Sequence, residues 1–190
     1  MKRFFETLFI LVAAPLWLPL LAFGALAVLV FLGRPVFFTD MRSGRGGVPF
    51  RMFKLRTMRP GEGSDAERTP RAGRILRKLS IDELPQFWHV LKGEMAIVGP
   101  RPLPVRYLPR YSASQRRRLE VRPGITGLAQ VMGRNAISWE EKFSYDVQYI
   151  DNLSLALDLK IVFLTFLRLV RPKGVNASAE ETMPEFTQNA

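Results

Sequence analysis

The sequence predicts an α+β protein that is mainly helical and is held at one face of a membrane. Three observations support this prediction. No charged residue lies between Glu6 and Arg34, and this apolar run is longer than the ~20 residues that a spanning helix needs. Helix-start patterns of the type Ser-x-x-Glu occur at Ser80 and Ser138. The strand-like segments between glycines and prolines are short, which indicates a small β element.

Residues 1–34 are expected to form a re-entrant membrane helix, broken in its middle. Basic residues precede the apolar run and Arg34 follows it. Positive flanks stay on the cytoplasmic side, so both ends are expected there. Pro15 and Pro19 interrupt helical hydrogen bonds, and either could be the break. A straight span is the alternative; a signal peptide is disfavoured, because the apolar run is too long and a good cleavage site does not follow it.

Residues 35–171 are expected to form one domain at the cytoplasmic face, and residues 172–190 a polar, loose tail. Within the domain, alternation and turn residues predict strands at 36–39, 50–58 and 95–98. Helices are predicted at 84–91, 112–120, 138–152 and 155–170. The last helix is apolar nearly all round apart from Lys160 and Arg168, with Arg171 after it, which suits an amphipathic helix at the membrane interface rather than a span.

The adjacent carboxylates Asp82 and Glu83 lie in a strongly basic chain, with 28 Lys+Arg against 17 Asp+Glu. Such a pair in basic surroundings fits a site that handles metal and phosphate together. A capping box led by Ser80 explains both acids without any function. Pro85 fits that alternative poorly, because a proline one turn into a helix removes a donor. If the helix begins near Pro85 instead, the two carboxylates are free to face a ligand.

Other charged side chains stand out by their context. Arg101 lies between Pro100 and Pro102, and a rigidly held guanidinium suits bidentate phosphate binding. Asp146 falls on the apolar face of its predicted helix, where a carboxylate needs a partner; a structural ion pair with a core arginine and an active-site role both remain open. His89 is interpreted as a packed side chain rather than a ligand, and the run 116–118 as a solvated or lipid-facing basic patch.

The amino-acid composition limits the kinds of molecule that the protein is expected to bind. The net charge of +11 implies an anionic partner: nucleic acid, anionic lipid or a phosphorylated substrate. Nucleic acid is disfavoured, because no array of aromatic residues accompanies the basic ones. The chain has no cysteine, so disulfides and cysteine-based metal sites are excluded. Association of the chain with a second copy is compatible with the sequence.

Taken together, the motifs resemble those of the bacterial sugar transferase family, the small monotopic phosphoglycosyl transferases. The resemblance covers nearly the whole chain, up to about Val170, with the motifs in one order. The matching segments are Phe53–Met58, Ser80–Gln86, Val90–Met95, Val98–Leu103, Arg122–Gly127, Gly133–Asn135, Asp146-Val147 and Leu157–Lys160.

The resemblance implies an enzyme of the bacterial inner membrane, acting at its cytoplasmic face. It would transfer a phosphosugar from a UDP-sugar to undecaprenyl phosphate and release UMP. Asp82 would be the nucleophile and a ligand of the required Mg²⁺, and Glu83 its partner in the dyad. Substrate-binding positions would be Lys54, Arg101, Arg134, Asp146 and Asp158. Carboxylate attack on phosphorus is a recognised covalent route, and cations would offset the diphosphate charge.

The chain departs from the family pattern at the helix break, where Leu18-Pro19 or Ala14-Pro15 replaces the usual Ser-Pro, so a hydroxyl that would satisfy the backbone is missing. Asp40-Met41 and Met132 replace amide-containing positions, which could alter donor recognition. Two non-catalytic alternatives remain: a basic membrane-anchored module that binds anionic lipid or nucleic acid, and a silent scaffold. Neither gives the two acids a purpose.

Overall fold

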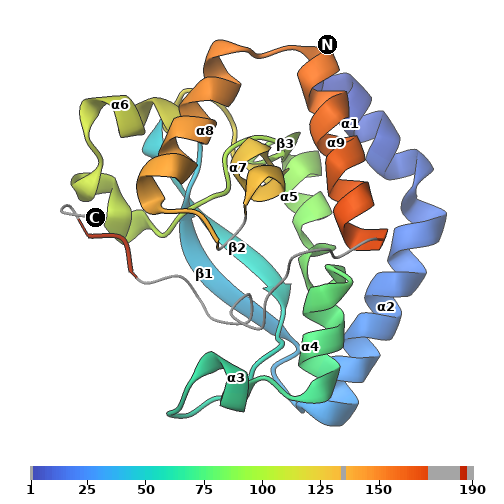
Figure 1. Cartoon of the computed structure of the whole chain (residues 1–190). Helices are drawn as coiled ribbons and strands as arrows, with labels where there is room; N and C mark the ends of the chain where they lie inside the picture. Colours follow the sequence, from blue (N-terminus) through green and yellow to red (C-terminus); the bar gives the residue numbers. More distant parts are fainter. Residues whose placement is uncertain (1, 134–135, 171–184, 188–190) are drawn as a thin grey trace.

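A computed structural model describes residues 2–133, 136–170 and 185–187 (Figure 1). Within them the chain is mainly helical, as predicted, with two small sheets. The α-helices are α1 (Lys2–Val12), α2 (Ala14–Phe31), α3 (Asp65–Arg68), α4 (Arg71–Lys78), α5 (Gln86–Lys92), α6 (Ala113–Arg116), α7 (Leu128–Met132), α8 (Trp139–Asp151) and α9 (Leu155–Val170). The 3-10 helices are η1 (Arg45–Gly47), η2 (Ile81–Glu83), η3 (Val105–Arg110) and η4 (Arg117–Leu119). The strands are β1 (Phe37–Ser43), β2 (Pro49–Leu55), β3 (Ala96–Val98) and β4 (Gly124–Thr126).

The strands form two separate pairs. β1 and β2 are an antiparallel hairpin in which Lys54 lies opposite Phe38, and β3 pairs with β4 in parallel. The second pair brings two glycine-bearing segments into close contact: a Cβ on Gly124 would lie 2.1 Å from the Gly99 nitrogen. Gly124 and Gly127 let the backbone of β4 approach Gly99, since a side chain at either position would collide there.

The apolar N-terminal run forms two helices rather than one. α1 ends at Val12 and α2 begins at Ala14, so the interruption lies next to Pro15, while Pro19 lies inside α2. The indole Nε1 of Trp17 donates to the carbonyl oxygen of Ile10 at 3.0 Å. This bond satisfies a carbonyl at the break, a task for which the sequence offers no hydroxyl. By length and composition alone, α2 could cross a membrane.

Both ends of the α1–α2 pair are bonded to the domain that follows. At the start, Lys2 Nζ donates to the Val98 carbonyl at 3.0 Å, and Glu6 accepts from the backbone N–H of Ile97 at 2.9 Å. At the end, the buried guanidinium of Arg56 donates to the carbonyls of Leu32 and Gly33 at 2.6 and 2.8 Å. The middle of the pair is left exposed.

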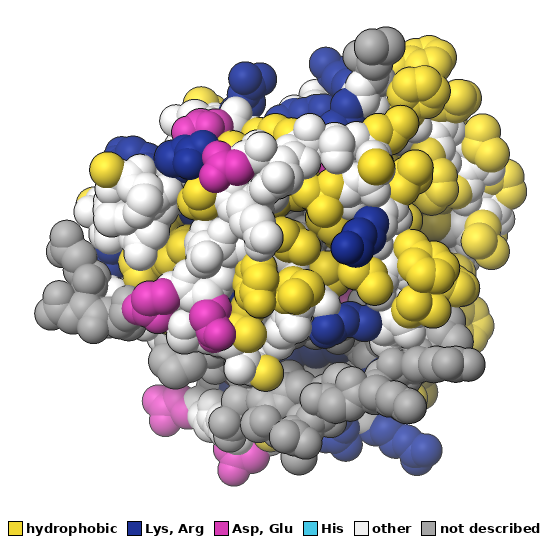
Figure 2. Space-filling view, turned by 45° about the horizontal axis from the view of Figure 1, so that its top comes forward, with side chains coloured by type: hydrophobic (Ala, Val, Ile, Leu, Met, Phe, Trp, Pro, Cys, Tyr) yellow, Lys and Arg dark blue, Asp and Glu magenta, His cyan; other side chains and the backbone are white. Residues whose placement is uncertain are grey.

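Exposed apolar side chains concentrate on α1 and α2, which Figure 1 places at the right of the molecule; the same edge is densely hydrophobic in Figure 2. α9 adds further exposed apolar residues, lying beside α1 in Figure 1. Those of α9 are Leu155, Leu159, Val162, Phe163, Phe166 and Leu167. A contiguous apolar surface of this kind is typical of a protein or membrane contact rather than of a water-exposed face.

Candidate active site

The two carboxylates lie in η2, the short turn between α4 and α5. Ser80 adopts the left-handed conformation (φ 54°) and its side chain forms no capping bond. The capping-box interpretation is therefore wrong. Pro85 precedes α5, which begins at Gln86 and ends at Gly93 (φ 84°), because proline is tolerated before the first turn of a helix but not within it. The acidic pair is thus outside both regular helices.

The membrane-type helix α2 packs directly against this turn. A Cβ on Gly24 would lie 2.7 Å from Cγ2 of Ile81 and 2.8 Å from Cδ1 of Leu55. The absence of a side chain at residue 24 therefore sets how closely α2 approaches η2. Ile81 directly precedes Asp82, so the position of the acidic pair is fixed by the apolar N-terminal region.

Asp82 is 4% exposed. Burial, and after it the charge of Glu83, raise the pKa of its carboxyl to a net value of about 6. Lys54, Arg77 and Arg101 oppose this rise. The result is a carboxylate whose ionised form is incompletely solvated, a state that is common at functional sites.

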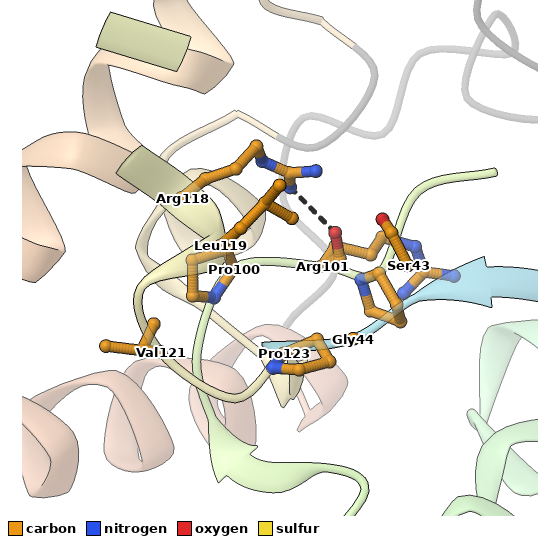
Figure 3. A pocket seen from close by; sticks show the side chains of 9 residues that line it. Ser43, Gly44, Pro100, Arg101, Arg118, Leu119, Val121 and Pro123 are labelled. Atoms are coloured by element: carbon orange, nitrogen blue, oxygen red, sulfur yellow. Dashed lines mark hydrogen bonds between the residues drawn. The ribbon is translucent and has the colours of Figure 1, made fainter. Parts of the chain in front are cut away.

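Arg101 contacts the acidic pair through Glu83. Its guanidinium donates to Glu83 Oε1 at 2.7 Å and is 43% exposed. Its own carbonyl oxygen accepts from Arg118 at 2.7 Å (Figure 3). The neighbouring carbonyl of Pro100 accepts from the Gly124 N–H at 2.9 Å. The turn is therefore fixed by hydrogen bonds as well as by its prolines, around a cavity of about 10 Å³, roughly the size of one water.

Lys54 approaches the dyad from β2. Burial lowers the pKa of its ammonium group, an effect that Asp82 opposes and Arg101 reinforces. Its Nζ also lies 5.8 Å from the centroid of the Phe38 ring. The predicted residues Asp82, Glu83, Lys54 and Arg101 thus come together, from η2, β2 and the turn after β3.

Two further cations around Arg101 escaped the sequence analysis. Arg42 lies at the end of β1, paired with Asp40 at 2.8 Å, and burial together with the charge of Arg101 lowers its pKa. Lys142 lies on α8, and burial followed by the charge of Arg101 lowers its pKa to about 8. Lys142 could have been suspected from its position one helical turn before Asp146; Arg42 carries no such signal.

Asp146 is buried in an ion pair with Arg118, with a distance of 2.8 Å and side chains that are 5% and 4% exposed. Its contacts are thus those of a structural ion pair with a core arginine, one of the two alternatives that the sequence left open. The prediction that Arg118 belongs to a solvated patch is wrong, because its guanidinium is enclosed by Asp146, the Tyr111 hydroxyl and the Arg101 carbonyl. Asp146 therefore supports the Arg101 turn from behind.

The remaining predicted site residues lie apart from this group. Asp158 accepts from the Tyr149 hydroxyl at 2.7 Å and pairs with Lys2 at 2.9 Å. These contacts join α9 and α8 to the start of α1. Arg134 lies outside the described residues. His89 is packed, as interpreted: its Nδ1 lies 2.6 Å from Glu94 Oε2 and its Nε2 accepts from the Phe53 N–H.

The two carboxylates of this site suit a metal ion that needs few protein ligands. Within the described ranges, no cluster of three or more His, Cys, Asp or Glu side chains occurs. Mg²⁺ commonly takes one or two carboxylates and completes its shell with water and phosphate oxygens. Asp82, with Glu83 beside it, fits that preference, so a phosphate-bearing substrate would have to supply the other ligands.

Comparison with known proteins agrees with this chemistry. A family model described as bacterial sugar transferase matches residues 1–172. An uncharacterized sugar transferase of Bacillus subtilis, EpsL, is 49% identical over 174 residues, which cover 88% of this chain and 86% of the relative. The UDP-glucose:undecaprenyl-phosphate glucose-1-phosphate transferase of Caulobacter vibrioides is 41% identical over 180 residues, covering 86% of this chain and 67% of the relative.

A third relative, the UDP-N-acetylgalactosamine-undecaprenyl-phosphate N-acetylgalactosaminephosphotransferase of Aeromonas hydrophila, is 38% identical over 187 residues. The match covers 91% of this chain but 44% of that relative. Since the family model matches nearly all of the chain, the protein is a transferase that belongs to the bacterial sugar transferase family.

Proposed function

We propose that the protein transfers a phosphosugar from a UDP-sugar to undecaprenyl phosphate, giving undecaprenyl diphosphate sugar and UMP. The observation that carries the proposal is the buried Asp82, whose pKa is raised to about 6 within a ring of cations. The names of the Caulobacter and Aeromonas relatives describe this class of reaction with glucose and N-acetylgalactosamine donors.

The reaction would proceed in two displacements. In the first, a carboxylate oxygen of Asp82 attacks the sugar-bearing phosphorus; the phosphoanhydride bond breaks and UMP leaves with the electron pair. In the second, a phosphate oxygen of the acceptor attacks the same phosphorus, and the Asp82 carboxylate leaves. Glu83 would take a proton from the acceptor phosphate. Splitting one transfer into two steps is the usual benefit of covalent catalysis.

The cations around the pair would bind and orient the diphosphate. Arg101 is partly exposed, beside Glu83, so it can reach a phosphate without leaving its turn. Lys54, Arg42 and Lys142 add positive charge where the diphosphate must lie, and preorganised charge stabilises a developing phosphorane better than mobile water does. A bound Mg²⁺, held by Asp82, would supply further neutralisation of the leaving phosphate.

The N-terminal helices α1 and α2 fit a reaction whose acceptor is carried by a lipid. We infer that α1 and α2 enter and leave through the cytoplasmic face of the inner membrane. Lys2 and Glu6 bind β3, while Leu32 and Gly33 bind Arg56 of the same domain. A straight span would place the first of these contacts on the far side of the bilayer. An acceptor carried by a lipid would then meet Asp82 at the membrane surface.

The covalent step is tested by trapping. Incubating the full chain with a UDP-sugar and Mg²⁺, without acceptor, should add one phosphosugar to the peptide containing Asp82, detected by mass spectrometry. Exchange of labelled UMP into the UDP-sugar should also occur, because the first step is reversible. Asp82→Asn should abolish both signals; the matched control Asp151→Asn, at an exposed pair with Arg117, should keep both. Normal turnover by the Asp82 variant would refute the covalent mechanism, whereas no turnover by the unmodified chain would favour a non-catalytic module.

The topology is tested by labelling single cysteines, which the cysteine-free chain allows. A cysteine added before Met1 and another at Lys92, exposed on α5, should both react with an impermeant maleimide in sealed inverted vesicles. Reaction at Lys92 with protection of the N-terminus would show a straight span instead.

A further inference from the structure

A short piece of the C-terminal tail is docked on the main domain. Residues 172–190 are polar and were expected to be loose, yet Phe186 is 1% exposed. Its ring lies 5.0 Å from the ring centre of Phe143, 5.4 Å from that of Trp139 and 5.6 Å from that of Tyr107. Figure 1 shows the segment 185–187 at the left of the molecule, far from α1 and α2. The expectation is therefore wrong for this segment.

Polar contacts fix the same segment. The carboxylate of Glu185 pairs with Arg106 at 3.1 Å and with Arg110 at 3.0 Å. The backbone N–H of Phe186 donates to the Tyr107 hydroxyl at 3.3 Å, and Arg110 donates to the Phe186 carbonyl. Main chain and side chains are both recognised, so the contact is specific in register and not a general apolar association.

The aromatic residues around Phe186 also hold the arginine behind the active site. Phe186 contacts Tyr111, with ring centres 5.9 Å apart, as well as Phe143. The guanidinium of Arg118 lies 5.7 Å from the Tyr111 ring centre and 5.5 Å from that of Phe143. It also donates to the Tyr111 hydroxyl at 3.2 Å. These two rings therefore separate Phe186 from Arg118.

From Arg118 the contacts continue to the acidic pair. Arg118 donates to the Arg101 carbonyl, the bond drawn in Figure 3, and the guanidinium of Arg101 donates to Glu83. The first bond joins the buried Arg118 to the main chain, and the second lies nearer the surface, where the Arg101 side chain is 43% exposed. Because a packed core does not deform continuously, removing one ring of this cluster moves the groups that rest on it.

We propose that Phe186 is a positioning residue of the transferase site: the docked tail segment completes the aromatic cluster that holds Arg118, and through it Arg101. The inference rests on the proposed function only for its catalytic consequence. The docking itself, and its dependence on Phe186 and Glu185, is independent of which reaction the protein performs.

The first test is a double-mutant cycle in the full chain. Phe186→Ala should lower kcat/KM for the UDP-sugar roughly 10- to 100-fold, as expected when a catalytic group is displaced by about 1 Å. In an Arg101→Ala background the same change should have little further effect, because the group through which Phe186 acts is already gone. Thr187→Ala, at the exposed neighbour, is the matched control and should change nothing.

A merely structural role predicts a different result, namely an equal loss in both backgrounds together with a lower melting temperature. Equal losses would therefore overturn the proposal. So would a faster Phe186→Ala enzyme, which would mean that the tail inhibits the site rather than completing it.

The second test separates docking from folding and from the proposed reaction. In the full-length double variant Glu185→Gln, Phe186→Ala, a peptide of residues 181–190 should bind and restore activity. Roughly millimolar peptide will be needed, because a tethered segment has an effective concentration in that range. The same peptide with Phe186→Ala should neither bind nor rescue.

Binding is measured by anisotropy of the labelled peptide without substrate, so it stands even if Asp82→Asn retains turnover and the proposed reaction fails. Absence of binding would refute the docked segment, and binding without rescue would refute its influence on Arg101.

Discussion

Asp82 and Asp146 are equally buried, each with 4% exposure, yet their surroundings differ. Asp146 faces one guanidinium, that of Arg118, at 2.8 Å, and the two charges compensate each other. Asp82 lies beside a second carboxylate, that of Glu83. The two carboxylates interact with the same cation, Arg101. The first arrangement is a closed pair that holds a loop. In the second arrangement the anionic form of Asp82 is destabilised, and the positive charges around it are of the kind that a phosphate would need.

Burial alone therefore does not tell whether a carboxylate stabilises the fold or takes part in a reaction. The charges beside the carboxylate do. A buried pair loses most when one partner is removed, because the other charge is left without compensation. Burial raises the pKa of both carboxyls, but Asp146 has Arg118 as a direct ion-pair partner, whereas a second carboxylate, Glu83, raises the pKa of Asp82 as well. Stability measurements should therefore separate the two residues.

The largest expected effect is at the closed pair. Asp146→Asn should lower the free energy of unfolding by about 3–5 kcal/mol, because Arg118 is left buried and unpaired. Asp151→Asn, which breaks the exposed pair with Arg117, should change it by ~1 kcal/mol or less. Denaturant unfolding in detergent micelles measures both. Similar losses for the two variants would show that the Asp146 pair is not the support inferred from its contacts.

A smaller effect of opposite sign is expected at Asp82. Its folded pKa of about 6 lies above the ordinary value of 3.8, so ionisation destabilises the fold as pH rises through that interval. Asp82→Asn should therefore stabilise the protein at pH 7 by on the order of 2 kcal/mol, and the difference should vanish below pH ~4. Thermal unfolding at both pH values tests this. A variant less stable at pH 7 would contradict the electrostatic description.

The smallest effect concerns the charge of Glu83. Glu83→Gln should bring the pKa of Asp82 below about 6, because the repulsion between the two carboxylates is removed. Carbon-13 NMR titration of labelled aspartate in metal-free buffer measures the shift. Glu94→Gln is the matched control, since Glu94 contacts His89 and Lys92 and not the dyad. An unchanged or higher pKa would assign the shift to burial alone.

Local patterns predicted what depends on local contacts. The capping box at Ser138 is present and begins α8, and Gly93 ends α5 as expected. The identical pattern at Ser80 failed, because Pro85 prevents the helix from continuing through the pair and Ser80 turns into the left-handed region. Neighbouring residues therefore decide whether a cap pattern is used.

The errors concern side chains whose partners are distant in sequence. Three consecutive arginines gave no sign that Arg118 would be buried against Asp146, 28 residues away. A polar tail gave no sign that Phe186 would fill an aromatic cluster 79 residues from Tyr107. Hydrophobic burial is non-directional, so composition predicts that such groups need partners without showing which ones.

The sequence by itself determined the apolar N-terminal region, the excess of positive charge, the approximate ends of α5, α8 and α9 and the identity of the acidic pair, because these follow from residue type and short spacing. Only the tertiary structure decided that Gly24 brings α2 against η2, that Arg101 turns its guanidinium to Glu83, and that Asp146 pairs with Arg118. These outcomes depend on which charges and surfaces meet after folding. The electrostatic state of a carboxylate is set by those neighbours.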